Sequence, residues 1–192
     1  MHTQPESDPL VRIAARRPKE VCASLQIDET SRALLETDPA PSRFLAALIE
    51  RTYTADAVAY LAHALPKADA VCWACQCVRI ALGDQSPAAA VKALAAAETW
   101  AREPSAENSR AAGAAAVESA NDCGARLAAL AAFWSGASLV PADLPPVPPP
   151  AGLTGAGVAG AVTLAATSGD PTSIPQRYRE FLARGILIAR TP

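Results

Sequence analysis

Apolar side chains recur at every third or fourth position along much of the chain, which is the spacing of one buried face of an α-helix. The spacing is clear over residues 44–65. Over residues 68–82 apolar side chains occur almost all round, and only Cys72, Gln76 and Arg79 share a more polar arc. We therefore expect residues 68–82 to form the central and most buried helix.

Capping and helix-breaking residues divide this pattern into separate helices. Asp28 has the side chain of an N-cap, and Ser86 followed by Pro87 is typical of a helix start. Gly83 and Gly136 are typical of helix ends. These signals predict roughly seven to nine helices in antiparallel pairs. Residues 18–25 are weakly helical, and one helix should begin at residue 41 or 42 and the next at residue 54 or 56. The other helices are expected over residues 28–36, 68–82, 87–103, 105–120, 123–136, 155–167 and 175–185.

Residues 186–189 have the sequence ILIA, a short β-favouring run that could pair with residues 10–14. The predicted fold is all-α, an irregular antiparallel helical bundle or a short degenerate helical stack, with one short terminal β pair. Much of the 51% hydrophobic content is alanine, and aromatic residues make up only 5%, so the helices should pack closely on small side chains. Gly157 and Gly160 should let another backbone come very close.

Six prolines lie between Pro141 and Pro150, and such a sequence favours an extended polyproline II conformation. We call residues 141–152 the strap. The predicted organisation is a flexible N-terminal tail over residues 1–9, a helical core over 10–140, the strap, and a C-terminal helical hairpin over 153–192 packed on the core.

Charge and cysteine usage limit the partners and the compartment. The chain has 17 Lys and Arg against 19 Asp and Glu, so no positive field attracts nucleic acid. The longest uncharged apolar run, residues 153–168, is shorter than the roughly 20 residues that span a bilayer, so no membrane insertion is expected. The five cysteines are an odd number at irregular spacing, which favours a reducing, cytoplasmic location.

Three cysteines invite a zinc or iron–sulfur interpretation, because thiolates are natural ligands for both. On a helix, however, Cys72 and Cys75 lie about 60° apart, while Cys77 lies about 140° and about 160° from them, so the three sulfurs diverge. Cys75 and Cys77 are interpreted as small buried hydrophobes. Cys72 shares its arc with Arg79, a cation that could stabilise its thiolate. Two of the three sulfurs could still bind one metal ion if His63 and Cys123 or Cys22 joined them from other helices.

His63 is the one histidine outside the N-terminal tail. Asp56 lies two helical turns before it, too far to orient the imidazole, so we expect His63 to pack at a helix end and bond a backbone carbonyl. Glu98 and Arg102 are spaced for an i,i+4 ion pair. No catalytic residue, metal ligand or cofactor is assigned. The alternative is a thiol-dependent enzyme or a metal-binding protein that uses Cys72, His63 and Cys75.

Candidate interaction residues are the tryptophans Trp100 and Trp134 and the prolines of the strap. Tryptophan is enriched at interaction hot spots, and Pro145, Pro146 and Pro148 include a PxxP spacing, although no basic residue flanks it. The leading prediction is a non-enzymatic protein–protein interaction module with a protein partner.

Two runs carry a resemblance to known sequences: ALPKADAVCWAC, from Ala64 to Cys75, and FWSGAS, from Phe133 to Ser138. With YREFLARGILIA they resemble an uncharacterised bacterial domain-of-unknown-function family, over nearly the whole chain from Phe44 onward. Cys72 stands where a second aromatic residue is expected before Trp73, which weakens a role for its thiol. The resemblance implies an adaptor or chaperone-like accessory associated with type VI secretion genes, and no known activity.

Overall fold

The computed structural model describes residues 8–15, 17–83, 86–120, 123–141 and 143–192. Within these ranges the chain is helical and has no strand, so the predicted all-α class is confirmed. The helices are α1 (Pro18–Cys22), α2 (Glu29–Ala33), α3 (Pro41–Glu50), α4 (Thr54–Ala64), α5 (Lys67–Leu82), α6 (Ala88–Arg102), α7 (Ala106–Glu118), α8 (Gly124–Trp134), α9 (Leu153–Thr167) and α10 (Ile174–Arg190), with two short 3₁₀ turns, η1 (Leu34–Thr37) and η2 (Pro171–Ser173).

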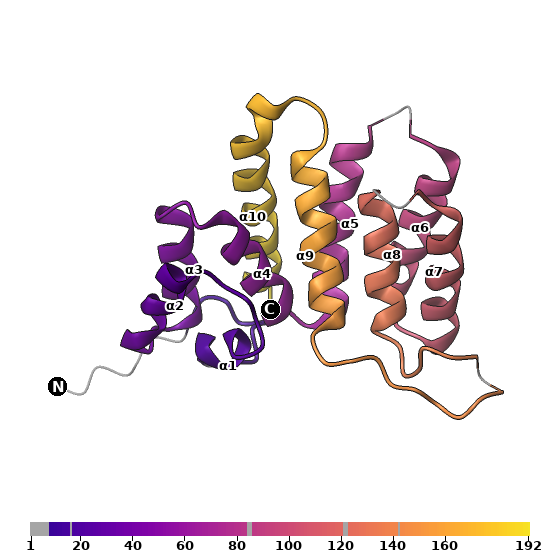
Figure 1. The fold of residues 1–192 in the computed structure, drawn as a ribbon, viewed down its shortest axis with the longest axis horizontal. Helices are drawn as coiled ribbons and strands as arrows, with labels where there is room; N and C mark the ends of the chain where they lie inside the picture. Colours follow the sequence, from indigo (N-terminus) through magenta and orange to yellow (C-terminus); the bar gives the residue numbers. More distant parts are fainter. Residues whose placement is uncertain (1–7, 16, 84–85, 121–122, 142) are drawn as a thin grey trace.

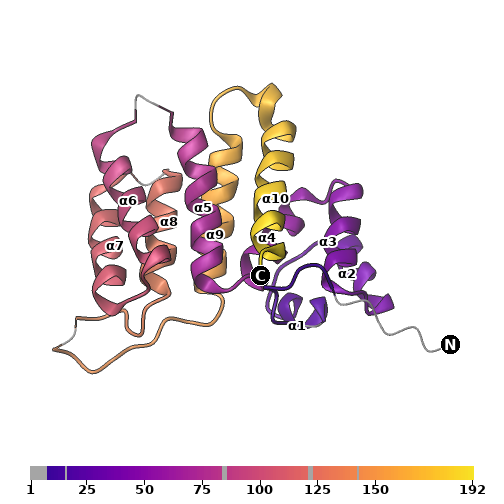
Figure 2. The same cartoon turned by 180° about the vertical axis from the view of Figure 1, so that it is seen from behind.

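Helices α5 to α10 reverse direction from one to the next in chain order, and in space α7 lies at one end of the group and helices α1 to α3 at the other (Figure 1). Helix α5 packs against α6, α8, α9 and α10, and its Trp73 is fully buried, as expected of a central helix. Helix α9 packs against α4, α5, α8 and α10, and Figure 2 shows it directly behind α5. Both α9 and α10 thus contribute buried residues to the hydrophobic core.

Small residues of α9 receive large side chains from α8. An added Cβ on Gly157 would lie 3.0 Å from the Trp134 ring, and one on Gly160 would lie 2.8 Å from Leu127 Cδ1. The sequence predicted that another backbone would approach these glycines. Side chains of α8 occupy that space instead, so the two glycines provide the room in which Trp134 and Leu127 pack closely against α9.

The expected terminal β pair is wrong, because α10 continues through residues 186–189 to Arg190. Phe181, Gly185 and Ala189 recur at helical spacing on the buried face of α10, so helix packing outweighs the local β preference. The two segments nevertheless meet, since Arg12 N donates a hydrogen bond to Ala189 O at 3.0 Å.

The ends of several helices follow the predicted capping chemistry. Asp28 accepts a hydrogen bond from Thr30 N at 2.9 Å, as an N-cap does, and α3 starts at Pro41. Ser86 behaves differently, because its Oγ donates to Leu82 O at 2.7 Å and so closes the end of α5 instead of starting α6.

Of the predicted flexible tail, residues 1–7 lie outside the described ranges. Asp8 is anchored: its Oδ2 accepts from Ser42 N at 3.0 Å and from Ser42 Oγ at 2.9 Å. Ala40, the N-cap residue of α3, has no side-chain oxygen, so Asp8 supplies the missing acceptor from a distant part of the sequence.

The strap extends away from the ends of the helices (Figure 1). Its course is held at its base, where Leu139 N donates to Val147 O at 2.8 Å and Val147 N donates to Ser138 Oγ at 3.1 Å. Leu144 and Val147 are 51% and 49% exposed, which shows that the strap leaves apolar side chains in solvent.

Candidate functional site

His63 packs against the start of α9. Its Nδ1 lies 2.9 Å from Ala59 O, and because a carbonyl only accepts, Nδ1 carries the proton. The ring rests on Gly155, where an added Cβ would lie 2.5 Å from ring carbons. The hydrogen bond from His63 to a backbone carbonyl agrees with the expectation from sequence. The helix end that the His63 ring contacts is the start of α9. His63 therefore has a packing role visible in its contacts.

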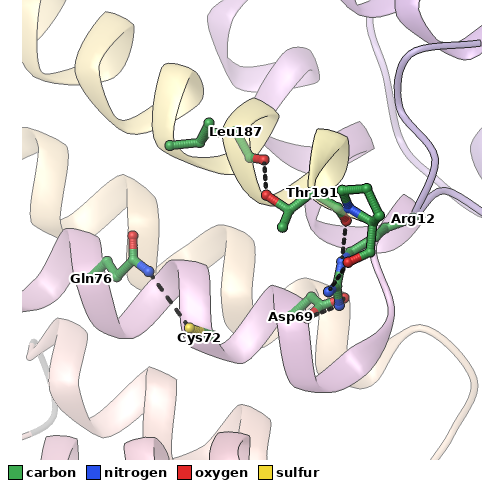
Figure 3. A network of polar contacts seen from close by, with 7 residues as sticks. Arg12, Asp69, Cys72, Gln76, Leu187 and Thr191 are labelled. Atoms are coloured by element: carbon green, nitrogen blue, oxygen red, sulfur yellow. Dashed lines mark hydrogen bonds and ion pairs between the residues drawn. The ribbon is translucent and has the colours of Figure 1, made fainter.

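Cys72 lies on a partly exposed edge of α5, where Gln76 Nε2 approaches its Sγ at 3.6 Å (Figure 3). Arg79, the cation expected beside it, is engaged elsewhere: its Nε and Nη2 donate to the two carboxylate oxygens of Glu98 at 2.8 and 2.6 Å. These bonds raise the pKa of Arg79. Glu98 thus pairs with Arg79 on α5, whereas its spacing in the sequence predicts a pair with Arg102.

Cys75 and Cys77 are 2% and 0% exposed, in agreement with their interpretation as small hydrophobes. Desolvation raises the pKa of both thiols well above the usual range, so both are protonated at neutral pH. Over the residues that the structure describes, no three His, Cys, Asp or Glu side chains are placed to hold a metal ion. The arrangement gives no support to a site built from Cys72, His63 and Cys75.

The densest polar network belongs to Arg12, which the sequence did not single out (Figure 3). Its Nη1 donates to both carboxylate oxygens of Asp69 at 3.1 and 3.0 Å, and its Nε donates to Thr191 O at 2.7 Å. Arg12 thereby joins the N-terminal segment to the first turn of α5 and to the carbonyls of Thr191 and Pro192 just after the C-terminal end of α10, where a cation is favoured. Because the partners are far apart in sequence, no local pattern predicts this contact.

The structure separates the predicted interaction residues. Trp100 is only 4% exposed, so its ring is unavailable to a partner. Trp134 is half-buried against Gly157. Pro145 and Pro148 are exposed on the strap, as is Pro146 between them. The exposed candidates therefore lie on the strap.

An apolar groove of about 540 Å³ runs between α7, α8 and the residues that lead into the strap. We call it the α7–α8 groove. Its lining residues are Arg110, Gly113, Ala114, Val117, Leu130, Phe133, Leu139, Val140 and Pro141.

Two features give this groove its shape. Gly113 lets the Phe133 ring lie against the backbone of α7, because an added Cβ would come within 2.8 Å of the ring. Val117 is 76% exposed, the highest value among the exposed large hydrophobic side chains of the described residues. Val147 of the strap accepts a backbone hydrogen bond from Leu139, a lining residue of the groove, and is itself 49% exposed. Arg110 is the charged lining residue.

Comparisons with known proteins add a family but no activity. No curated protein and no solved structure matches the chain. Among the helices of the described residues, none is both long enough and apolar enough to cross a membrane. A family model described as "Family of unknown function (DUF6931)" matches residues 44–189. The predicted resemblance to an uncharacterised domain is thereby confirmed from Phe44 onward, and the chain belongs to the Family of unknown function (DUF6931).

Proposed function

We propose that this protein is a non-enzymatic protein–protein interaction module whose partner binds in the α7–α8 groove. The observation that carries the proposal is the exposed apolar lining of that groove, with Val117 76% exposed. Helix α7 packs against α6 and α8 on one side and forms the end of the helical row (Figure 1). The groove lies on the face where α7 meets α8, and Ala114 and Val117 of α7 are exposed there.

The physical reason is the cost of leaving apolar surface in water. Burial of a side chain such as Val117 is worth roughly 1.5 kcal/mol or more, and contiguous apolar surface on a folded protein often marks an interaction site. Phe133 and Arg110 belong to residue types that are enriched in interfaces. The apolar lining of the groove can thus bury apolar side chains of a partner, and the cation Arg110 can orient that partner.

The wider role follows from the resemblance stated above. We infer an adaptor or chaperone-like accessory of bacterial type VI secretion, acting in the cytoplasm on a protein partner. All five cysteines are free, which is consistent with a reducing compartment. The net charge of -2 favours a protein over nucleic acid as the partner.

Affinity capture with two matched variants tests the proposal. Val117→Asp places a charge in the groove, and Leu187→Asp places the same charge on α10, where Leu187 is 67% exposed. Both positions are exposed, so both variants should keep the wild-type melting temperature.

The wild-type chain and Leu187→Asp should capture the same protein from the native cell, and Val117→Asp should lose it. The captured protein should then bind the purified chain directly. Equal capture by all three chains, or equal loss in both variants, would show that the groove is not the binding surface.

A further inference from the structure

The described residues that line the α7–α8 groove have their backbone amides already bonded. On α7 and α8 these residues lie inside the helices, where each N–H donates to the carbonyl four residues before it. At the strap end of the groove, Leu139 N donates to Val147 O at 2.8 Å. Val140 N donates to Ser138 Oγ at 3.2 Å, and Pro141 has no N–H. The lining therefore has no free amide to offer a partner.

This lining favours a helical partner over an extended one. The carbonyls of an extended segment would face the groove without donors, and a buried polar group without a partner is costly. An α-helix bonds its own amides and carbonyls along its length, so it can lie on an apolar surface with its backbone satisfied. The segment that enters the groove should therefore be an amphipathic helix.

The residue spacing along α7 matches such a helix. Arg110, Ala114 and Val117 are spaced i, i+4 and i+7, so they form one stripe along two turns of α7. Leu130 and Phe133 lie one turn apart on α8 and form the neighbouring stripe. The small side chain of Ala114, in the middle of the first stripe, lets a third helix approach closely, as packed helices do at roughly 8–10 Å between axes.

Arg110 determines the charge that the partner helix should carry. It is exposed, and every other residue that lines the groove is apolar. Among the ion pairs that join described residues, none involves Arg110. A guanidinium offers only donors, so a carboxylate is its complementary group. Arg110 and Val117 are seven residues apart, or about 10 Å along the axis of α7, and a partner helix covers that distance in the same number of residues.

We propose that the α7–α8 groove binds an amphipathic α-helix of the partner protein, in which an acidic residue lies seven positions from the apolar residue that contacts Val117. The carboxylate pairs with Arg110, and the apolar face covers Ala114, Val117, Leu130 and Phe133. This assignment rests on the function proposed above, because it identifies the kind of segment that occupies the same groove.

Photo-crosslinking from position 117 of the full chain, in the native cell, identifies the partner residue that contacts Val117. An acidic residue should lie seven positions before or after it. An extended segment would cover the same distance in about three residues, at roughly 3.3 Å per residue. If position 117 gives no discrete adduct, the proposed function fails and the helical assignment fails with it. An adduct between two copies of this chain overturns the assignment to a separate partner protein.

Binding of the purified chain to the partner thus identified tests the charge. Arg110→Glu should weaken binding about tenfold. Arg179→Glu, the same change at an exposed position of α10, is the matched control and should bind as the wild type does. Lysine in place of the partner's acidic residue should restore binding to Arg110→Glu. Both variants should keep the wild-type melting temperature, because both side chains are exposed.

A proline substitution in the partner tests the helix. Proline in the middle of the identified segment, at a position facing away from the groove, should weaken binding at least tenfold, and alanine at the same position should not. The helical assignment alone is overturned, with the groove retained as the binding surface, if proline is tolerated. The same holds if Arg110→Glu binds as tightly as Arg179→Glu, or if lysine in the partner restores nothing.

Discussion

Replacing Gly155 by alanine should destabilise the protein, because the ring of His63 occupies the space that the new methyl group needs. An ideal Cβ at this position would lie 2.5 Å from His63 Cδ2 and Cγ and 2.7 Å from Nε2. The ring is held by the bond from Nδ1 to Ala59 O at 2.9 Å. It therefore moves away only by giving up that bond.

The magnitude follows from three contributions. Overpacking of a filled site costs roughly 1–3 kcal/mol, and the loss of one neutral hydrogen bond costs roughly 0.5–1.5 kcal/mol. Alanine is a better helix former than glycine by about 1 kcal/mol, which offsets part of this loss. The free energy of unfolding of Gly155→Ala should thus fall by about 2 kcal/mol, and the contributions bound the loss between about 0.5 and 3.5 kcal/mol.

A double-mutant cycle measured by urea unfolding isolates the contact. In the His63→Ala background, Gly155→Ala should be neutral or stabilising, which gives a coupling energy of about 2 kcal/mol. Gly160→Ala is the control on the same helix: its new methyl group would meet only the flexible end of Leu127, so the change should be nearly neutral. If the effects of the two substitutions in the cycle add within about 0.5 kcal/mol, His63 does not pack on α9 as described.

Three further substitutions test the termini, a helix end and a buried thiol. Arg12→Gln should lower the free energy of unfolding by only about 1 kcal/mol, because the Arg12 side chain is 37% exposed and solvent screens its ion pair with Asp69. An unchanged urea midpoint would show that the contacts of Arg12 do not stabilise the fold. Thr52→Gly should raise the free energy of unfolding by about 0.5–1 kcal/mol, because Thr52 has φ +61°, and a lower melting temperature would contradict this. Burial raises the pKa of the Cys22 thiol from 9.0 to about 11, so the unfolded state ionises first and stability should fall between these pH values. Cys22→Ala should flatten that alkaline loss in pH-dependent urea unfolding, and an identical pH profile would argue against the buried thiol as its cause.

Helix boundaries were predictable where the signal is local. Asp28 caps its own helix, α3 starts at its proline, and the helix expected over residues 68–82 appears as Lys67–Leu82. In each case the deciding chemistry lies within a few residues of the boundary, so neighbouring sequence is sufficient.

Predictions were wrong where a distant partner decides the outcome. The ILIA run is helical because Ala189 is buried in the face that α10 presents to the core. Glu98 was expected to pair with its i,i+4 neighbour Arg102. It pairs instead with Arg79 on α5, which donates two short charge-assisted hydrogen bonds to it. Local propensity and spacing are weak compared with such tertiary contacts.

The candidate groove was only partly visible in the sequence. Trp134 and the prolines of the strap were expected to interact, but the lining of the groove comes from segments as far apart as Arg110 and Pro141. The available signal was Val117, the one large apolar residue between Ala106 and Glu118. Its exposure could be established only after α7 was placed at the end of the row.

The central claim is that a partner protein occupies the α7–α8 groove, and site-specific photo-crosslinking in the native cell tests it most directly. A photoreactive phenylalanine derivative is placed at Val117, or at Leu187 as the control, since both side chains are well exposed. We predict a discrete covalent adduct with one protein from position 117 and none from position 187. Absence of an adduct at 117, or the same adducts from both positions, would contradict the account.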